Sequence, residues 1–380
     1  MPVPISVRRG FTLMELLVVI MVIAVLASSM LFAMYHAVQQ AKESRTKVQI
    51  AKLHELLMTR WDSYRTRAIR LQGLPPLARR DARAVATARL LALRELMRLE
   101  LPDRREDVVE GTAVAGVNLK VPYLEAGSLK TATVYITRPA CNREYARRVG
   151  KIGGVANWSE TYQDSECLYM IIASMQDITG NALDFFQEAE IGDTDGDRMP
   201  EILDAWGKPI AFIRWPAGFV EHPGPDFTFG TVDDIPSYSN LHVVDPVGSS
   251  DPFDPLRVDT RPPPPAMTSP PWPAKMDPDG AGTAEYQFGF ALYPLVVSGG
   301  PDEALDIVRF DFDPDGDHSV QIPFNYYRTG NNPYLPAGWP DALWPNDPYS
   351  VMPTCKRRLA EPFLESDGYK DNITNHGLGG

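Results

Sequence analysis

The sequence has few of the residues that build catalytic or soft-metal sites. It contains three cysteines and six histidines among 380 residues, and no two cysteines form a C-x-x-C pair. A cysteine zinc site and a disulfide-rich scaffold are therefore disfavoured. The sequence also lacks G-x-S-x-G, H-E-x-x-H, P-loop and G-x-G-x-x-G motifs, which supply nucleophiles, zinc ligands or phosphate-binding backbone. We predict that the protein is not an enzyme.

Positive charge is scarce over most of the chain. There are 37 Lys and Arg against 49 Asp and Glu, a net charge of −12, and after residue 110 the counts are 19 against 38. A nucleic-acid-binding face needs clustered basic residues, so we expect no nucleic acid as partner. An acidic surface is compatible with an extracytoplasmic location and with hard cations.

One long apolar run lies near the N-terminus. The nineteen residues Leu16–Met34 are all uncharged, and as a helix they would reach roughly 28 Å, about the hydrocarbon thickness of a bilayer. Arg8 and Arg9 precede the run, which by the positive-inside rule predicts a cytoplasmic N-terminus. A secretory signal peptide would have a shorter apolar core followed by a small-residue cleavage site. We therefore predict a retained single-pass anchor.

Glu15 lies at the head of this segment, where a carboxylate costs a few kcal/mol unless it is paired. One explanation is that Glu15 sits at headgroup level and is stabilised by the helix N-terminal dipole. The other is a positive partner at the same depth. Cleavage after Gly10 would create such a partner, because it would leave a new ammonium group on Phe11.

Residues 8–16, RRGFTLMEL, resemble the class III signal of type IV pilins and type II secretion pseudopilins. The resemblance implies cleavage after Gly10 by a prepilin peptidase, N-methylation of Phe11, and pairing of Glu15 with a neighbouring subunit's N-terminus during filament assembly. It also implies insertion in the inner membrane and a domain that is periplasmic or part of an extracytoplasmic filament. The partners would be other pilin or pseudopilin subunits, an inner-membrane assembly platform and membrane lipid.

Helical patterns continue beyond the anchor. Residues 37–61 contain no Gly or Pro, and their apolar stripe should pack on the globular domain; it comprises Val48, Ala51, Leu53, Leu56 and Leu57. Residues 79–101 predict a second amphipathic helix whose arginines form a solvated face. Residues 131–137 predict a strand, and 161–177 predict a helix that buries Leu168, Ile171 and Ile172.

Carboxylates alternate along residues 193–204. Oxygens at Asp193, Asp195 and Asp197, followed by Glu201 or Asp204, match the spacing that lets one loop surround a hard cation. The segment is not an EF-hand, but it resembles the shorter D-x-D-G-D calcium loops of extracellular proteins. Carboxylates this close would repel one another without a cation, so we predict bound Ca²⁺ rather than a solvated acidic turn. A second run of the same kind comprises Asp311, Asp313, Asp315 and Asp317.

Residues 204–210, DAWGKPI, resemble the D-x-W-G-x-P turn of major pseudopilins, with Trp206 as a core anchor and a strand at 210–215. Residues 286–297 alternate as a strand and lead into SGGPD at 298–302. This segment is similar to the calcium-binding loop of those proteins, which implies Asp302 and Asp306 as ligands. The DNITN segment at 371–375 is an alternative for the closing loop.

Cys141 and Cys167 could form a disulfide in an oxidising periplasm, and the sequence leaves both states open. The Pro-rich stretch at 251–280 predicts an extended loop.

The fold expected is α+β: a long N-terminal transmembrane helix continuing into a pilin-like globular domain with an antiparallel sheet and calcium-type loops. The expected segments are a leader (1–10), a transmembrane assembly helix (11–36), its periplasmic half (37–72), a helical insertion (73–130), a pseudopilin-like α/β region (131–250), the proline-rich loop (251–280) and C-terminal strands with acidic loops (281–380). The predicted function is that of a structural subunit of a type II secretion pseudopilus or type IV pilus-like filament. The alternative is a membrane-tethered periplasmic calcium-dependent binding module that does not assemble.

Overall fold

The computed structural model describes residues 13–109, 117–125, 128–177, 180–216, 251–256, 258, 260–261, 287–288, 292–307, 309 and 371–376. Over these residues the predicted α+β class is confirmed. Gly10, Phe11 and the acidic run with Asp311, Asp313, Asp315 and Asp317 lie outside the described residues.

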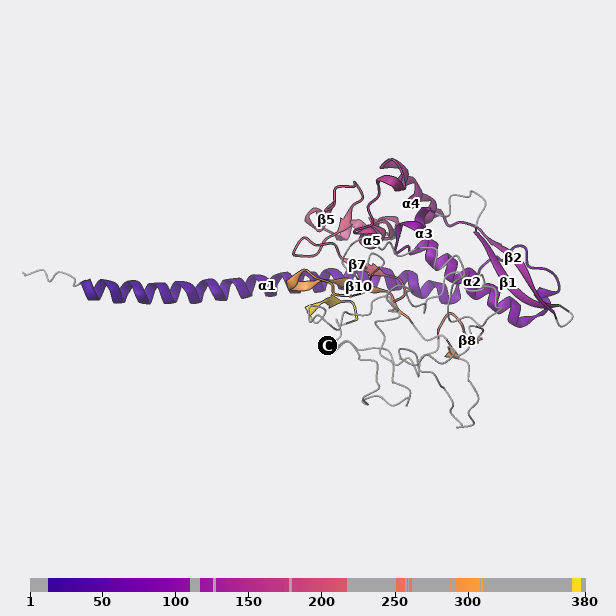
Figure 1. Cartoon of the computed structure of the whole chain (residues 1–380), viewed down its shortest axis with the longest axis horizontal. Helices are drawn as coiled ribbons and strands as arrows, with labels where there is room; N and C mark the ends of the chain where they lie inside the picture. Colours follow the sequence, from indigo (N-terminus) through magenta and orange to yellow (C-terminus); the bar gives the residue numbers. More distant parts are fainter. Residues whose placement is uncertain are drawn as a thin grey trace, which may run out of the picture.

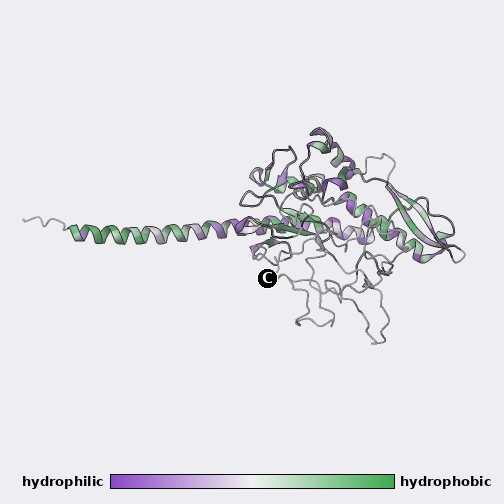
Figure 2. Ribbon diagram, in the orientation of Figure 1, coloured by the Kyte–Doolittle hydropathy of each residue, from purple (hydrophilic) through white to green (hydrophobic). Residues whose placement is uncertain are grey.

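Helix α1 (Leu13–Thr66) is the longest element, with 54 residues. At 1.5 Å per residue it is about 80 Å long. Its first half projects from the domain (Figure 1) and is apolar (Figure 2), whereas its second half runs through the domain. The most apolar part is not buried at all, and it is long enough to cross a membrane. Because no Gly or Pro interrupts α1, anchor and domain share one continuous helix.

The remaining elements form the domain around the second half of α1 (Figure 1). The helices are α2 (Ala82–Glu100), α3 (Arg105–Val109), α4 (Ala140–Lys151) and α5 (Gln163–Ser174), with 3₁₀ turns at Ala78–Arg80, Val155–Asn157, Ala182–Phe185, Glu188–Glu190 and Gly300–Asp302. The strands are β1 (Val117–Glu125), β2 (Ser128–Ile136), β3 (Gln176–Asp177), β4 (Gly180–Asn181), β5 (Ile191–Gly192), β6 (Glu201–Ile202), β7 (Ala211–Ile213), β8 (Thr260–Arg261), β9 (Gln287–Phe288), β10 (Leu295–Ser298) and β11 (Ile373–Thr374).

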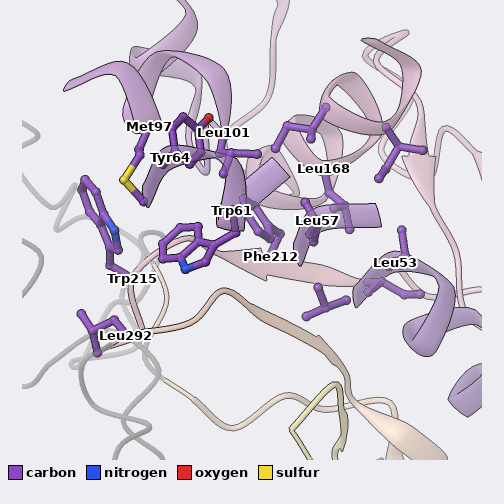
Figure 3. Packing of buried hydrophobic residues seen from close by; sticks show 14 of the residues in the cluster. Leu53, Leu57, Trp61, Tyr64, Met97, Leu101, Leu168, Phe212, Trp215 and Leu292 are labelled. Carbon is purple, nitrogen blue, oxygen red and sulfur yellow. The ribbon is translucent and has the colours of Figure 1, made fainter. Parts of the chain in front are cut away.

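The main core joins α1, α2 and α5 to an antiparallel sheet of order β11-β10-β7 (Figure 3). The buried apolar side chains that α1 contributes are Ile50, Leu53, Leu57, Trp61 and Tyr64. In α5 the predicted burial of Leu168, Ile171 and Ile172 is confirmed. Packing of these faces, rather than helix propensity, stabilises the domain.

The predicted stripe on α1 is only partly correct. Leu53 and Leu57 are buried and Leu56 is half-buried, but Val48 is 57% exposed and Ala51 is exposed. At 100° per residue, Val48 and Ala51 lie roughly 140° and 160° around the helix from Leu53. The buried face of α1 therefore consists of residues spaced three and four apart, on the side of the helix opposite Val48 and Ala51.

A second core lies between α2 and the β1–β2 hairpin, at the end of the domain far from the anchor (Figure 1). The strands pair antiparallel from Val117↔Ile136 to Glu125↔Ser128. Thus the stretch 73–130, predicted as a helical insertion, ends in strand, and the strand expected at 131–137 is the second half of β2. The sequence did not predict β1 because Pro122 lies inside it, and proline is unusual within strands.

Two further C-terminal predictions need correction. The strand expected at 286–297 is divided into β9 and β10, since Pro294 directly precedes β10 and lacks the N–H that a paired strand residue donates. The proline-rich stretch begins inside the core, because Phe253 is buried and packs edge-on against Trp61 with ring centroids 5.4 Å apart.

Two arginines predicted to be solvated are buried. Arg94 pairs with Asp251 at 3.2 Å, and Arg98 pairs with Glu95 at 2.6 Å and with Asp107 at 3.0 Å. Asp251 is remote from Arg94 in sequence and Asp107 lies on the next helix, so a helical charge pattern alone could not reveal these pairs. These ion pairs connect α2 to α3 and to the segment that follows residue 250.

Candidate functional site

The turn at residues 204–209 docks the domain on α1. Asp204 accepts hydrogen bonds from the N–H groups of Trp206 at 2.8 Å and Lys208 at 2.9 Å, and from the Ser298 hydroxyl at 2.6 Å. The Trp206 indole donates to Gln39 of α1 at 2.9 Å. Trp206 is thus half-buried, and it packs against the main core as well as binding α1. Both Asp204 oxygens serve the turn and Ser298, so the structure does not support Asp204 as a metal ligand.

The predicted acidic loop connects β5 to β6 and brings three predicted ligands together. Asp193, Asp195 and Asp197 each offer a carboxylate oxygen, and these oxygens lie within 4.8 Å of one another. The loop is folded by its own side chains: Asp193 accepts from the Gly196 N–H at 2.7 Å, and Asp197 accepts from the Ser159 N–H at 2.7 Å. Clustered hard oxygen donors on alternate residues fit a Ca²⁺ ion.

A carboxylate from another element completes this acidic cluster. Oxygens of Glu166, on α5, Asp195 and Glu201 also lie within 4.8 Å of one another. Glu166 and Glu201 are both fully buried. The sequence analysis missed Glu166, although an acidic residue within the apolar helix at 163–174 is a signal that could have singled it out.

Burial raises the pKa of both buried carboxyl groups. For Glu166, burial and the charges of Asp197 and Asp195 outweigh the hydrogen bond from the Trp158 indole, and the pKa rises to about 9. For Glu201, burial outweighs the hydrogen bonds from Thr194, and the pKa rises to about 7. Both carboxyl groups therefore keep a proton more readily than a solvated glutamate does, because their surroundings disfavour a further negative charge.

Asp302 and Asp306 follow β10 in a second acidic loop. Pairing of β10 with β11 places Asp371 beside them, and the pKa of Asp371 is raised by partial burial and by the charges of Asp302 and Asp306. Gly300 is required here, because a Cβ on it would lie 2.4 Å from the Asp371 carbonyl oxygen. The SGGPD and DNITN segments thus meet at one edge. Among the described residues, neither Asp302 nor Asp306 belongs to a group of three residues whose ligand atoms all lie within 4.8 Å of one another.

Cys141 and Cys167 are free thiols in the structure, so the disulfide considered for them is not formed. Their surroundings differ. Burial raises the pKa of both thiols, but Cys141 is close to Glu100 and Arg60, whereas the fully buried Cys167 is close to Asp107 and Glu166. The two side chains therefore face separate groups of charges.

One carboxylate, that of Glu15, lies at the start of α1. Glu15 lies in the first helical turn, where the N-terminal dipole favours a negative charge. The large apolar side chains that follow it, from Leu16 to Met34, are exposed. Residues 5–31 match the model of the prokaryotic N-terminal methylation motif. The chain thus carries a type IV pilin-like signal of the kind that prepilin peptidase processes.

The match spans Gly10, Phe11, Glu15 and most of the apolar run. A pilin-like motif of this kind indicates a structural subunit that assembles with others of its type, rather than an enzyme. No curated protein and no solved structure matches the chain. The functional argument for the domain therefore depends on its own geometry.

Proposed function

We propose that this chain is a structural subunit of a type II secretion pseudopilus or a type IV pilus-like filament. The observation that carries the proposal is the methylation motif at residues 5–31, which overlaps the start of a helix whose most apolar part is unburied and whose second half is built into the domain. An apolar surface of this size needs lipid or neighbouring helices to cover it. Because α1 is continuous, packing of its first half in a filament would also fix the position of the domain.

The proposed pathway begins with the anchor in the inner membrane, its N-terminus in the cytoplasm and its domain in the periplasm. Cleavage after Gly10 and N-methylation of Phe11 then give the mature N-terminus. In the filament, Glu15 pairs with the N-terminus of a neighbouring subunit, which compensates the cost of a carboxylate in an apolar environment. An inner-membrane assembly platform would extract the subunit from lipid.

Calcium binding at the acidic loop is part of the proposal. Asp193, Asp195 and Asp197 supply hard oxygen donors at a spacing that fits Ca²⁺. A bound ion would neutralise their mutual repulsion and hold the β5–β6 connection in one conformation. Asp302 and Asp306, with Asp371 beside them, are a further pair of proposed ligands.

The assembly proposal is tested with Glu15→Gln in cells that contain prepilin peptidase and the assembly platform. The substitution keeps the size of Glu15 but removes its charge, so processing should continue while recovery of the chain in the sheared filament fraction falls at least about tenfold, the factor that corresponds to about 1.4 kcal/mol. Glu55→Gln, an exposed position on the same helix, is the matched control. Absence of the wild-type chain from filaments would favour the membrane-tethered binding module instead.

A further inference from the structure

Glu166 is a buried carboxylate whose hydrogen bonding is incomplete. The side chain is 0% exposed. One oxygen, Oε2, accepts a hydrogen bond from the Trp158 indole. Within the described part of the chain, the other oxygen, Oε1, has no hydrogen-bond partner. An unsatisfied buried carboxylate oxygen is costly, so its retention needs an explanation.

Glu166 has other carboxylates as close neighbours. Its carboxylate lies within 4.8 Å of those of Asp195 and Glu201. In the loop, the backbone N–H of Arg198 donates to Asp193 at 3.0 Å. Glu201 is hydrogen-bonded by Thr194 through N–H at 3.0 Å and through the hydroxyl at 3.1 Å.

We propose that Glu166, Asp195 and Glu201 form a cation site that joins α5 to the acidic loop and takes a hard divalent ion of the Ca²⁺ class. The site differs from a loop-only calcium site because one ligand comes from a core helix. Three carboxylates and no nitrogen or sulfur donor favour Ca²⁺ or a similar hard ion over zinc. The inference rests on the proposed calcium binding but not on filament assembly.

The geometry explains how binding would be coupled to the fold. Asp195 belongs both to this group and to the loop group with Asp193 and Asp197, so an ion held by Asp195 is close to the donors of both. Asp197 additionally accepts from the Ser159 N–H, next to Trp158. An ion at Glu166 would therefore fix the loop, the segment before α5 and α5 itself as one unit.

The test uses the full-length chain in detergent micelles, with Tb³⁺ as a luminescent probe that Ca²⁺ displaces. The indole of Trp158 contacts Glu166 and can sensitise a Tb³⁺ ion at this site. Wild-type protein should show tryptophan-sensitised luminescence that saturates and that Ca²⁺ reverses. Glu166→Gln should weaken Ca²⁺ binding at least about tenfold. The exposed Glu188→Gln makes the same charge change outside the cluster and should leave binding unaltered.

A second measurement separates loss of a ligand from misfolding. Without calcium, Glu166→Gln should be about as stable to heat as wild type, because the amide keeps the size and shape of the buried carboxyl group and adds no charge. Added Ca²⁺ should raise the melting temperature of wild type by mass action and should raise that of the variant much less. A variant that is less stable than wild type without calcium and responds to calcium normally would overturn the inference.

Comparing Ca²⁺ binding by Asp193→Asn and by Glu166→Gln separates the proposed calcium binding at the loop from the proposed contribution of Glu166. If Asp193→Asn weakens binding and Glu166→Gln does not, the ion is held by the loop alone, and this inference is wrong while the proposed calcium binding stands. If wild type binds neither Tb³⁺ nor Ca²⁺, both are wrong. If both variants weaken binding, the ion is shared between loop and helix as proposed.

Discussion

At the scale of single residues, Arg214 has the most demanding environment. It is 1% exposed, and its guanidinium donates to the Leu101 carbonyl at 2.7 Å and to Asp107 at 2.9 Å while pairing with Asp103 at 3.2 Å. It also stacks over the Trp215 ring at 4.3 Å. Burial alone would raise the pKa of Asp107, but the guanidinium groups of Arg214, Arg104 and Arg98 outweigh burial and lower it. Arg214 therefore joins the end of β7 to α3 and to the segment between α2 and α3.

Arg214→Met should destabilise the fold strongly, because it leaves Asp103 and Asp107 buried with fewer positive partners. The expected loss in the free energy of unfolding is about 3–5 kcal/mol. Arg147→Met is the matched control, since Arg147 is 71% exposed in its pair with Glu144, and should change stability by less than about 1 kcal/mol. Denaturant titration of the full chain in micelles measures both. Equal effects of the two substitutions would contradict this account of Arg214.

His376 predicts a dependence of stability on pH. Its ring nitrogen contacts the Pro294 carbonyl at 3.2 Å, and burial and the neighbouring His54 lower its pKa to about 4 despite that contact. The unfolded chain takes up this proton near pH 6.5. Between pH 6.5 and 4 the unfolded state therefore holds more protons, so stability falls as the pH decreases.

The expected loss across that window is about 2 kcal/mol, reduced from the full shift because the ring is partly exposed. His376→Gln should flatten the melting-temperature profile between pH 6.5 and 4. His36→Gln, on the exposed part of α1, should preserve the wild-type slope. A His376→Gln profile as steep as wild type would show that other groups control this range.

At the scale of elements, the buried face of α1 packs into the main core and so joins the exposed first half of the helix to the domain. Leu57→Ala should cost about 2–5 kcal/mol, because it opens a cavity beside Trp61 and Phe212 in the main core. Val48→Ala, on the exposed side, should change stability by less than about 0.5 kcal/mol. Thermal unfolding of both variants checks the orientation of the helix. A larger loss of stability for Val48→Ala than for Leu57→Ala would show that Val48 lies on the packed face of α1, as the sequence pattern suggested.

These elements show what local sequence could and could not predict. The α5 face was predictable because Leu168, Ile171 and Ile172 are spaced for one side of a helix. The α1 stripe was only partly correct because apolar residues occur on both sides of the helix, and only the tertiary contacts select the side with Ile50. The pairing of Arg94 with Asp251 was not predictable, since 157 residues separate the two partners.

The candidate site was likewise only partly predictable from the sequence. Asp193, Asp195 and Asp197 were found from their alternation within one loop, and the structure brings them together. Glu166 was missed because it joins the cluster only through the packing of α5 against β6. Spacing alone also could not show that Asp204 is engaged elsewhere, since it accepts hydrogen bonds from Trp206 and Lys208 in the turn that follows β6.

At the scale of the whole molecule, one helix connects two environments. The first half of α1 exposes large apolar side chains, and the second half forms the spine of an acidic domain (Figure 2). The long apolar helix and the methylation motif were predictable, because each depends on a contiguous run of sequence. The domain was not, because its cores combine segments as distant as α1 and β11.

The central claim is that the chain is processed after Gly10 and assembled through the exposed half of α1. Mass spectrometry of the N-terminal peptide from membranes that contain prepilin peptidase tests it most directly. We predict a peptide that begins at Phe11 and carries one added methyl group on its amino terminus, and we predict its loss in a Gly10→Val variant. An intact Met1 terminus in wild-type protein under these conditions would contradict the claim and leave the helix as a simple membrane tether.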